Sequence, residues 1–167
     1  MVSFRSIASK SGIRTYKPLE SSSELAGSRL AFAEQLFVIR HPLKLVVRVD
    51  RVYDNGRYLV LLELKTRLTH EIYPADLIEL SAQRLAVHHS TKREVADYGY
   101  VLLLHPFLRT QTLRLVKLFS EETVIAMARR RQRLLGGLTA PTRTTVRTRC
   151  TRCEYRHECR SLDVEPK

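Results

Sequence analysis

Apolar positions along the chain change their spacing several times, and each change predicts a new structural element. Residues 1–20 show no clear period and are expected to form a loosely packed arm. The next segment follows a serine run suited to a helix N-cap, and its apolar residues have helical spacing: Leu25, Leu30, Ala33, Leu36 and Phe37. Proline disfavours helical geometry in the preceding residue, so this predicted helix, over residues 22–40, should end at His41-Pro42.

A β-hairpin is predicted over residues 43–65. Two aliphatic runs lie on either side of Asn55-Gly56 there, and Asn-Gly is a strong signal for a hairpin turn. A two-residue turn would pair Asp54 with Arg57. The second run is apolar almost throughout, which is typical of a strand buried on both faces.

Two more helices and two more strands are predicted after the hairpin. Pro74 suits the first turn of a helix over 74–89, and the apolar runs at 98–105 and 112–119 predict strands. The segment 120–137 predicts a helix, because it has a serine cap, an acidic first turn, basic later turns and two glycines at its end.

The order of these elements predicts an α/β fold in one domain. A central mixed sheet flanked by helices is expected over residues 21–138, followed by a basic, cysteine-bearing tail over residues 139–167. A chain of 167 residues is short for two domains, and no internal repeat is visible.

The charge balance narrows the expected partners. The 29 Lys and Arg residues outnumber the 17 Asp and Glu residues, which leaves a formal charge of +12. A polyanion is the expected partner of such a surface, and nucleic acid is favoured over a membrane. No apolar run approaches the roughly 20 residues of a membrane span, and the first residues lack the apolar core of a signal peptide, so a cytoplasmic protein is expected.

Three charged residues of the hairpin are candidates for chemistry. Side chains alternate along strands, so a two-residue turn would put Asp50, Glu63 and Lys65 on one face of the sheet. Asp50 and Glu63 would then be diagonal neighbours, roughly 7–8 Å apart, and could share Mg²⁺ or Mn²⁺. The alternative is a strand end that emerges into solvent, with Glu63 paired to Arg48.

This arrangement resembles a known nuclease superfamily. An Asp at Asp50, Glu-x-Lys at Glu63 and Lys65, and then a helix are similar to the PD-(D/E)xK nucleases, whose core is restriction-endonuclease-like, and in particular to RecB-like nucleases. Some RecB-like members also end on the spacing Cys-x2-Cys-x5-Cys, which this chain repeats. The chain resembles above all the CRISPR-associated RecB-like exonucleases of antiviral defence, which carry a [4Fe–4S] cluster beside a metal-dependent nuclease site.

The resemblance implies phosphodiester hydrolysis in DNA, on single strands or at ends, by an exonuclease more than by an endonuclease. Asp50 and Glu63 would hold Mg²⁺ or Mn²⁺, and Lys65 would offset developing negative charge or orient the attacking water. The family's Gln-Leu-x-x-Tyr helix is here Glu79-Leu-Ser-Ala-Gln83. Gln83 would therefore take the role of the family's glutamine, or Glu79 would join the metal site.

Two departures from the family pattern keep a second function open. The helix before the hairpin often supplies a histidine to the metal in this family, whereas this chain offers only His41, beside Pro42. The glutamine motif is altered as well. The alternative is therefore a catalytically inactive nucleic-acid-binding module of the same fold, acting with other proteins of a nucleic-acid-processing complex. A regulator whose tail orders on binding metal is the third hypothesis.

The tail carries two further groups of candidate residues. Cys150, Cys153 and Cys159 have the spacing of ligands for a [4Fe–4S] cluster, or for Zn²⁺ with His157 as the fourth ligand, and unligated thiols are the remaining alternative. The family's fourth cluster cysteine precedes these three, and this chain has no cysteine before residue 150. The arginines predicted to follow a DNA backbone, where a solvated surface is the plainer alternative, are Arg143, Arg147, Arg149 and Arg152.

Overall fold

The computed structural model describes residues 2–3, 25–142, 144, 150–151, 153–154 and 156. The chain forms two compact units, residues 1–132 and 133–167. Within the described residues, the first unit contains two sheets and the helix α1, and the helix α2 continues across the boundary between the units.

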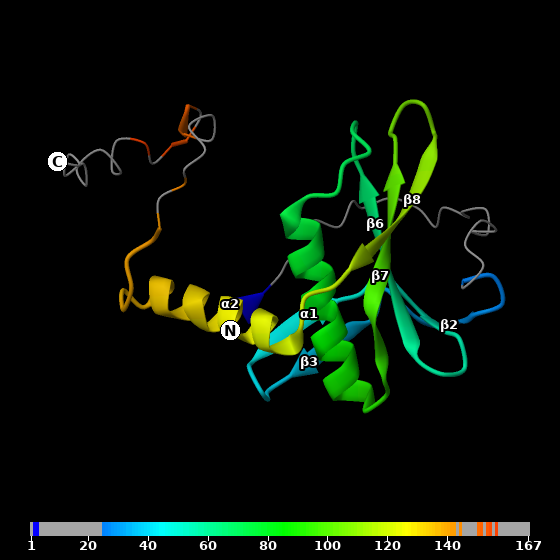
Figure 1. Ribbon diagram of the computed structural model, residues 1–167, viewed down its shortest axis with the longest axis horizontal. Coiled ribbons are helices and arrows are strands. Elements are labelled where there is room, and N and C mark those ends of the chain that lie inside the picture. Colours follow the sequence, from blue (N-terminus) through cyan, green and yellow to red (C-terminus); the bar gives the residue numbers. More distant parts are fainter. Residues whose placement is uncertain are drawn as a thin grey trace. The chain divides into compact units, whose positions relative to one another are not determined.

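The larger sheet of the described residues is mixed and has the order β2-β5-β6-β7-β8. Its pairs are antiparallel except β6 and β7, which are parallel. Parallel neighbours need a crossover, and α1 (Pro74–Thr91) provides it. Figure 1 shows α1 in green, running along the sheet beside β6 and β7. The strands are β2 (Arg29–Ala33), β5 (Arg51–Asp54), β6 (Leu59–Thr66), β7 (Val95–Leu104) and β8 (Gln111–Lys117).

A smaller sheet contacts α1 through two of its strands. It contains β1 (Val2–Ser3), β3 (Leu36–Ile39) and β4 (Leu45–Arg48) in the order β1-β4-β3, with β1 parallel to β4. β1 lies within the expected N-terminal arm of residues 1–20, and the rest of that arm lies outside the described part.

The prediction of a helix over residues 22–40 is wrong, because this segment contains β2 and β3 instead. Phe37 and Ile39 are buried while Leu36 and Val38 are exposed, which is the period-two pattern of a strand. Leu36 and Phe37 also fit a helical period, so a short apolar run did not distinguish the two structures. The His41–Pro42 peptide bond, expected to end the helix, is cis and lies between β3 and β4.

The first strand of the predicted hairpin is two strands. β4 pairs with β3 in the smaller sheet, whereas β5 pairs with β6 in the larger sheet. The chain passes from one sheet to the other at Val49 and Asp50. Asp50 therefore lies where the two sheets meet.

The later elements are confirmed, with bounds that differ by a few residues. α1 begins at the expected proline, and the two expected strands are β7 and β8. α2 (Glu121–Leu135) starts behind a serine cap, because the Thr123 N–H donates a 3.3 Å hydrogen bond to Ser120 Oγ. None of the helices in the described part of the chain has the length and apolar character that a membrane span requires.

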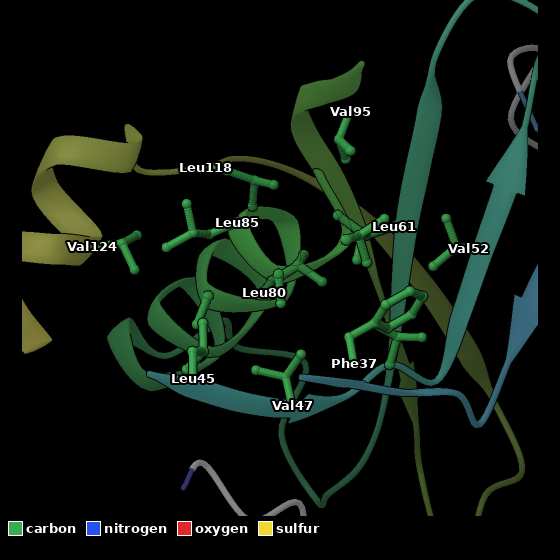
Figure 2. Close-up of a cluster of buried hydrophobic side chains, with 14 of the residues drawn as sticks. Phe37, Leu45, Val47, Val52, Leu61, Leu80, Leu85, Val95, Leu118 and Val124 are labelled. Carbon is green, nitrogen blue, oxygen red and sulfur yellow. The ribbon is translucent and has the colours of Figure 1, made fainter. Parts of the chain in front are cut away.

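The main hydrophobic core lies around α1. Figure 2 shows Leu80 of α1 on the side of Leu61 of β6 and Val47 of β4, whereas Leu85 lies on the side of Leu118 and Val124. The helix approaches β7 closely at Gly99, where a Cβ atom would lie 2.9 Å from Leu80 Cδ2 and 3.2 Å from the Leu61 carbonyl oxygen. Glycine at this position therefore lets α1 pack against the sheet.

Candidate active site

β6 carries charged residues toward α1 because its side chains alternate between two cores. Leu61 packs in the core on the α1 side, whereas Leu62 packs in a second core on the opposite face. Glu63 and Lys65 continue the alternation of Leu61 and therefore face α1. Glu63 is fully buried, and Lys65 emerges from the core with 18% of its side chain exposed.

Both oxygens of the Glu63 carboxylate have close partners. Lys65 Nζ lies 2.7 Å from Oε1, and Gln83 Nε2 on α1 donates a hydrogen bond to Oε2 at 2.7 Å. The Lys65 ammonium also lies 2.7 Å from Glu79 Oε2. Glu79 and Gln83 are one helical turn apart and share a face of α1, so the helix supplies partners to both charged residues of β6.

Asp50 approaches this group from the short link between β4 and β5. Its Oδ2 accepts a 2.7 Å hydrogen bond from the Leu64 N–H. The β5–β6 ladder pairs Arg51 with Leu62, so its continuation by one residue would place Asp50 opposite Glu63.

The register predicted for this hairpin is wrong, and the turn explains the difference. Asp54 pairs with Leu59 and not with Arg57. The Asn55 side chain accepts a 3.0 Å hydrogen bond from the Arg57 N–H and holds a longer loop than the expected two-residue turn. Continued by one residue, the observed register would turn the two candidate carboxylates from diagonal neighbours into facing ones.

The protein environment disfavours the charged forms of both carboxylates. Burial, reinforced by the nearby charge of Asp50, raises the pKa of Glu63 to about 7. Burial also raises the pKa of Asp50, despite the hydrogen bond from Leu64. The pKa of Lys65 is raised as well, because Glu63 and Glu79 outweigh the effect of its own burial. Two neighbouring carboxylates with raised pKa values and one ammonium leave a site that favours further positive charge.

Comparison with known families assigns the chain. A model of the PD-(D/E)XK nuclease superfamily matches residues 5–160. The chain belongs to the PD-(D/E)XK nuclease superfamily. Membership suggests a nuclease, and the mixed sheet with α1 is consistent with the core of that superfamily.

Individual proteins add little to this assignment. Among solved structures, the crystal structure of SSO0001 is similar at 16% sequence identity and a TM-score of 0.47. The match covers 78% of this chain and 60% of the SSO0001 chain, so this chain spans less than two thirds of that protein's length. A search of curated proteins found no match.

A divalent metal is typical of PD-(D/E)XK nucleases, and the donor atoms present here fit one. The carboxylates of Asp50 and Glu63 are hard oxygen donors, which Mg²⁺ and Mn²⁺ prefer. Gln83 Oε1 beside them is buried without a hydrogen-bond partner among the described residues. No group of three or more His, Cys, Asp or Glu side chains suited to a metal occurs in the described part, so water or substrate oxygens would complete the shell, as is usual for Mg²⁺.

Gln83 and Glu79 are the two residues that the sequence offered in place of the superfamily's glutamine. The structure brings Gln83 to Glu63 and Glu79 to Lys65. Gln83 Nε2 also lies 3.3 Å from the Arg48 carbonyl oxygen. The alternative pairing of Arg48 with Glu63 is not seen, since the Arg48 guanidinium lies 3.9 Å from Glu34.

His41 is not brought to the nuclease site. It is exposed between β3 and β4, and the β3–β4 ladder places it at the opposite end of β4 from Asp50. The described residues 25–40 contain strands in place of the helix expected before the hairpin, and the Glu34 N–H of this segment donates a 3.0 Å hydrogen bond to the Asp50 carbonyl oxygen.

Sequence reasoning missed one ion pair that extends the site. Arg67 follows Lys65 by two residues, and its guanidinium donates hydrogen bonds of 3.0 and 2.7 Å to the two oxygens of Asp76 on α1. Asp76 also accepts the Tyr73 N–H at 2.8 Å and so fixes the start of the helix. The sequence did carry a signal for this alignment. Asp76, Glu79 and Gln83 follow one another at spacings of three and four residues on the helix, and Glu63, Lys65 and Arg67 at two-residue spacing along and just after the strand.

Most of the tail residues singled out in the sequence lie outside the described part. In the second unit, Cys150 is half-buried, Cys153 is exposed, and the Cys153 N–H donates to the Cys150 carbonyl oxygen at 3.4 Å. The residues outside the description are Cys159, His157, Arg143, Arg147, Arg149 and Arg152.

Proposed function

We propose that this PD-(D/E)XK protein is a DNA nuclease that depends on Mg²⁺ or Mn²⁺ and uses Asp50, Glu63 and Lys65. The observation that supports it best is the fully buried Glu63 carboxylate, held between the Lys65 ammonium and the Gln83 amide at 2.7 Å each. Burial of a charge in this way destabilises a protein unless the charge is paired or binds a cation. The nearby charge of Asp50 also raises the pKa of Glu63, and a bound cation would offset both negative charges.

Each residue would have a separate task. A divalent cation held by Asp50 and Glu63 would polarise the scissile phosphodiester and lower the pKa of a bound water. Lys65 would donate to a phosphoryl oxygen and offset the negative charge that develops in the transition state. Glu79 would orient the Lys65 ammonium, and Gln83 would fix the Glu63 carboxylate by donating a hydrogen bond to Glu63 Oε2.

The proposed substrate is DNA, as single strands or free ends, and the proposed mode is exonucleolytic. The basic character of the chain, with a formal charge of +12, supports a polyanionic substrate. Incubation of circular and linear single-stranded DNA with Mg²⁺, Mn²⁺ or EDTA tests this. An exonuclease degrades the linear form alone, and cleavage of the circle would instead establish an endonuclease.

For the tail we propose a [4Fe–4S] cluster, or Zn²⁺, bound by Cys150, Cys153 and Cys159. The cysteine spacing supports this, as it supports kinship with the CRISPR-associated RecB-like exonucleases. Arg143, Arg147, Arg149 and Arg152 would contact the DNA backbone beside it. Metal analysis of anaerobically purified protein and of Cys150→Ser tests the proposal. Iron or zinc lost in the variant would support it, and neither metal in the wild-type protein would refute it.

A catalytically inactive DNA-binding module remains the second candidate. The absence of a histidine ligand at the expected place favours it, because His41 lies far from Asp50 along β4. It predicts salt-sensitive DNA binding without cleavage under any metal, and action within a complex with other proteins. The contacts of Gln83 and Lys65 with Glu63 favour the active enzyme.

A further inference from the structure

The turn between β7 and β8 exposes large apolar side chains on a rigid support. Phe107 and Leu108 are 79% and 68% exposed. Their N–H groups donate hydrogen bonds of 3.3 and 3.1 Å to Nδ1 of His105, and the Arg109 N–H donates to the His105 carbonyl oxygen at 3.1 Å. The turn is therefore already ordered, so a ligand that binds these side chains loses little free energy to ordering the turn.

Three aromatic rings follow one another along this turn. The rings of His70 and His105 have centroids 6.1 Å apart and planes inclined by 31°, and the Phe107 ring lies 6.3 Å beyond His105. His70 comes from the loop between β6 and α1, and its Nδ1 lies 3.0 Å from Thr112 Oγ1 on β8. Figure 1 shows this loop and the β7–β8 turn next to one another at the top of the view.

The rings lie on the same face of the sheet as the catalytic candidates. Leu103 packs on the α1 side, and its neighbours in the ladder are Lys65 on β6 and Thr112 on β8. In the adjacent row, Glu63, Val101 and Arg114 are neighbours in the same way. Adjacent strands are about 4.8 Å apart, so the backbones of Glu63 and Arg114 are separated by roughly 10 Å.

Positive charge accompanies the rings. Arg109 and Arg114 are exposed, and neither forms an ion pair with a residue that the structure describes. Phe107 is exposed, and His70 and His105 are half-buried beside it. Rings on which bases can stack, next to guanidinium groups for phosphates, are the combination that single-stranded nucleic acid requires.

We propose that the hairpin platform, defined as His70, His105, Phe107, Arg109, Thr112 and Arg114, binds single-stranded DNA and leads it to Glu63 and Lys65. Bases stack on the rings, and phosphates contact Arg109 and Arg114. The inference rests on the proposed nuclease function for its substrate, and it adds the surface that recognises an unpaired strand. Duplex DNA, whose bases are already stacked, gains little from the rings.

Fluorescence anisotropy of labelled oligo-dT in EDTA tests the platform without catalysis. Phe107→Ala should weaken binding of oligo-dT by at least about fivefold and leave binding of a blunt duplex nearly unchanged. Leu115→Ala is the matched control, because Leu115 is 63% exposed on the opposite face of β8. Equal affinities of the two variants for oligo-dT, or no binding of oligo-dT by the wild-type protein, would overturn the inference.

A second pair of variants tests the phosphate contacts. Arg114→Ala should lower the slope of log affinity against log salt by about 0.7, the value for one phosphate of a single strand. Lys117→Ala removes the same charge from the opposite face of β8 and should leave the slope nearly unchanged. The nuclease proposal can fail independently of the platform. If the wild-type protein never cleaves DNA but Phe107→Ala still weakens its binding of oligo-dT, the platform is supported and the nuclease proposal is refuted.

Discussion

Gln83 Nε2 donates a 2.7 Å hydrogen bond to Glu63 Oε2 and so joins the middle of α1 to the last buried residue of β6. The next residue on this face of the strand, Lys65, meets Glu79 one turn earlier on the helix. The helical rise over three to four residues is about 5–6 Å and nearly equals the rise of two strand residues, so successive pairs stay matched. The site is therefore built by one helix aligned against one strand.

Removal of the Gln83 amide should destabilise the protein. Gln83→Ala leaves Glu63 Oε2 without its donor in the core, and an unsatisfied buried group of this kind costs about 1–3 kcal/mol in the free energy of unfolding. Urea denaturation measures the loss. The control, Gln111→Ala, changes an exposed glutamine of β8 and should have little effect. Similar stabilities of the two variants would show that this hydrogen bond does not support the site.

Gly99→Ala should loosen α1 from the sheet. The added methyl group would lie 2.9 Å from Leu80 Cδ2 and 3.2 Å from the Leu61 carbonyl oxygen, and such overpacking costs about 1–3 kcal/mol. The same change moves the helix that carries Glu79 and Gln83. In a double-mutant cycle, Leu80→Ala removes the colliding atom, so the double variant should be more stable than the sum of the single losses predicts. Additive losses would contradict the close approach.

Metal-free protein should lose stability as the pH rises toward neutrality. The pKa of Glu63 is about 7 in the folded chain, above its ordinary value of 4.5, so between these values the folded state binds more protons than the unfolded state. The free energy of unfolding therefore falls with rising pH across this window, by on the order of 1–3 kcal/mol. Asp50, whose pKa is also raised, contributes with the same sign.

Urea titrations in EDTA at several pH values measure this dependence, and Glu63→Gln should flatten it. Glu71→Gln, at an exposed position, should keep the wild-type slope. Asp54 acts in the opposite direction and at lower pH, because the Arg93 guanidinium holds its pKa well below the usual range. If Glu63→Gln left the slope of unfolding free energy against pH unchanged, the pKa of Glu63 would not be raised in the folded protein.

The helices were predictable because their signals are local. Pro74 and the serine cap at Ser120 mark helix starts through geometry and hydrogen bonds within a few residues, and both are seen. Residues 22–40 also follow a serine run suited to a helix N-cap, but this local signal was misleading, because the segment contains β2 and β3. Their apolar residues fit a helix and a strand equally, and the choice depends on pairing with β4 and β5, which no local pattern shows.

The sequence predicted which residues form the candidate site better than it predicted the contacts between them. Asp50, Glu63 and Lys65 stand out as charges in aliphatic runs, and Gln83 follows from the family motif displaced by one turn. The placement of Asp50 relative to Glu63 depends on the loop that Asn55 holds, which the Asn-Gly signal predicted two residues too short. The Arg67–Asp76 pair needed the alignment of α1 on β6, which only the packing of the core determines.

The most direct test of the central claim is DNA cleavage by the wild-type protein, Lys65→Ala and Lys117→Ala. Labelled single-stranded DNA is incubated with Mg²⁺ or Mn²⁺ and, separately, with EDTA. We predict metal-dependent cleavage that falls by roughly 100-fold or more in Lys65→Ala and persists in Lys117→Ala, with DNA affinity retained in both. Cleavage by Lys65→Ala at the wild-type rate, or cleavage that survives EDTA, would contradict an active site built on Glu63 and Lys65.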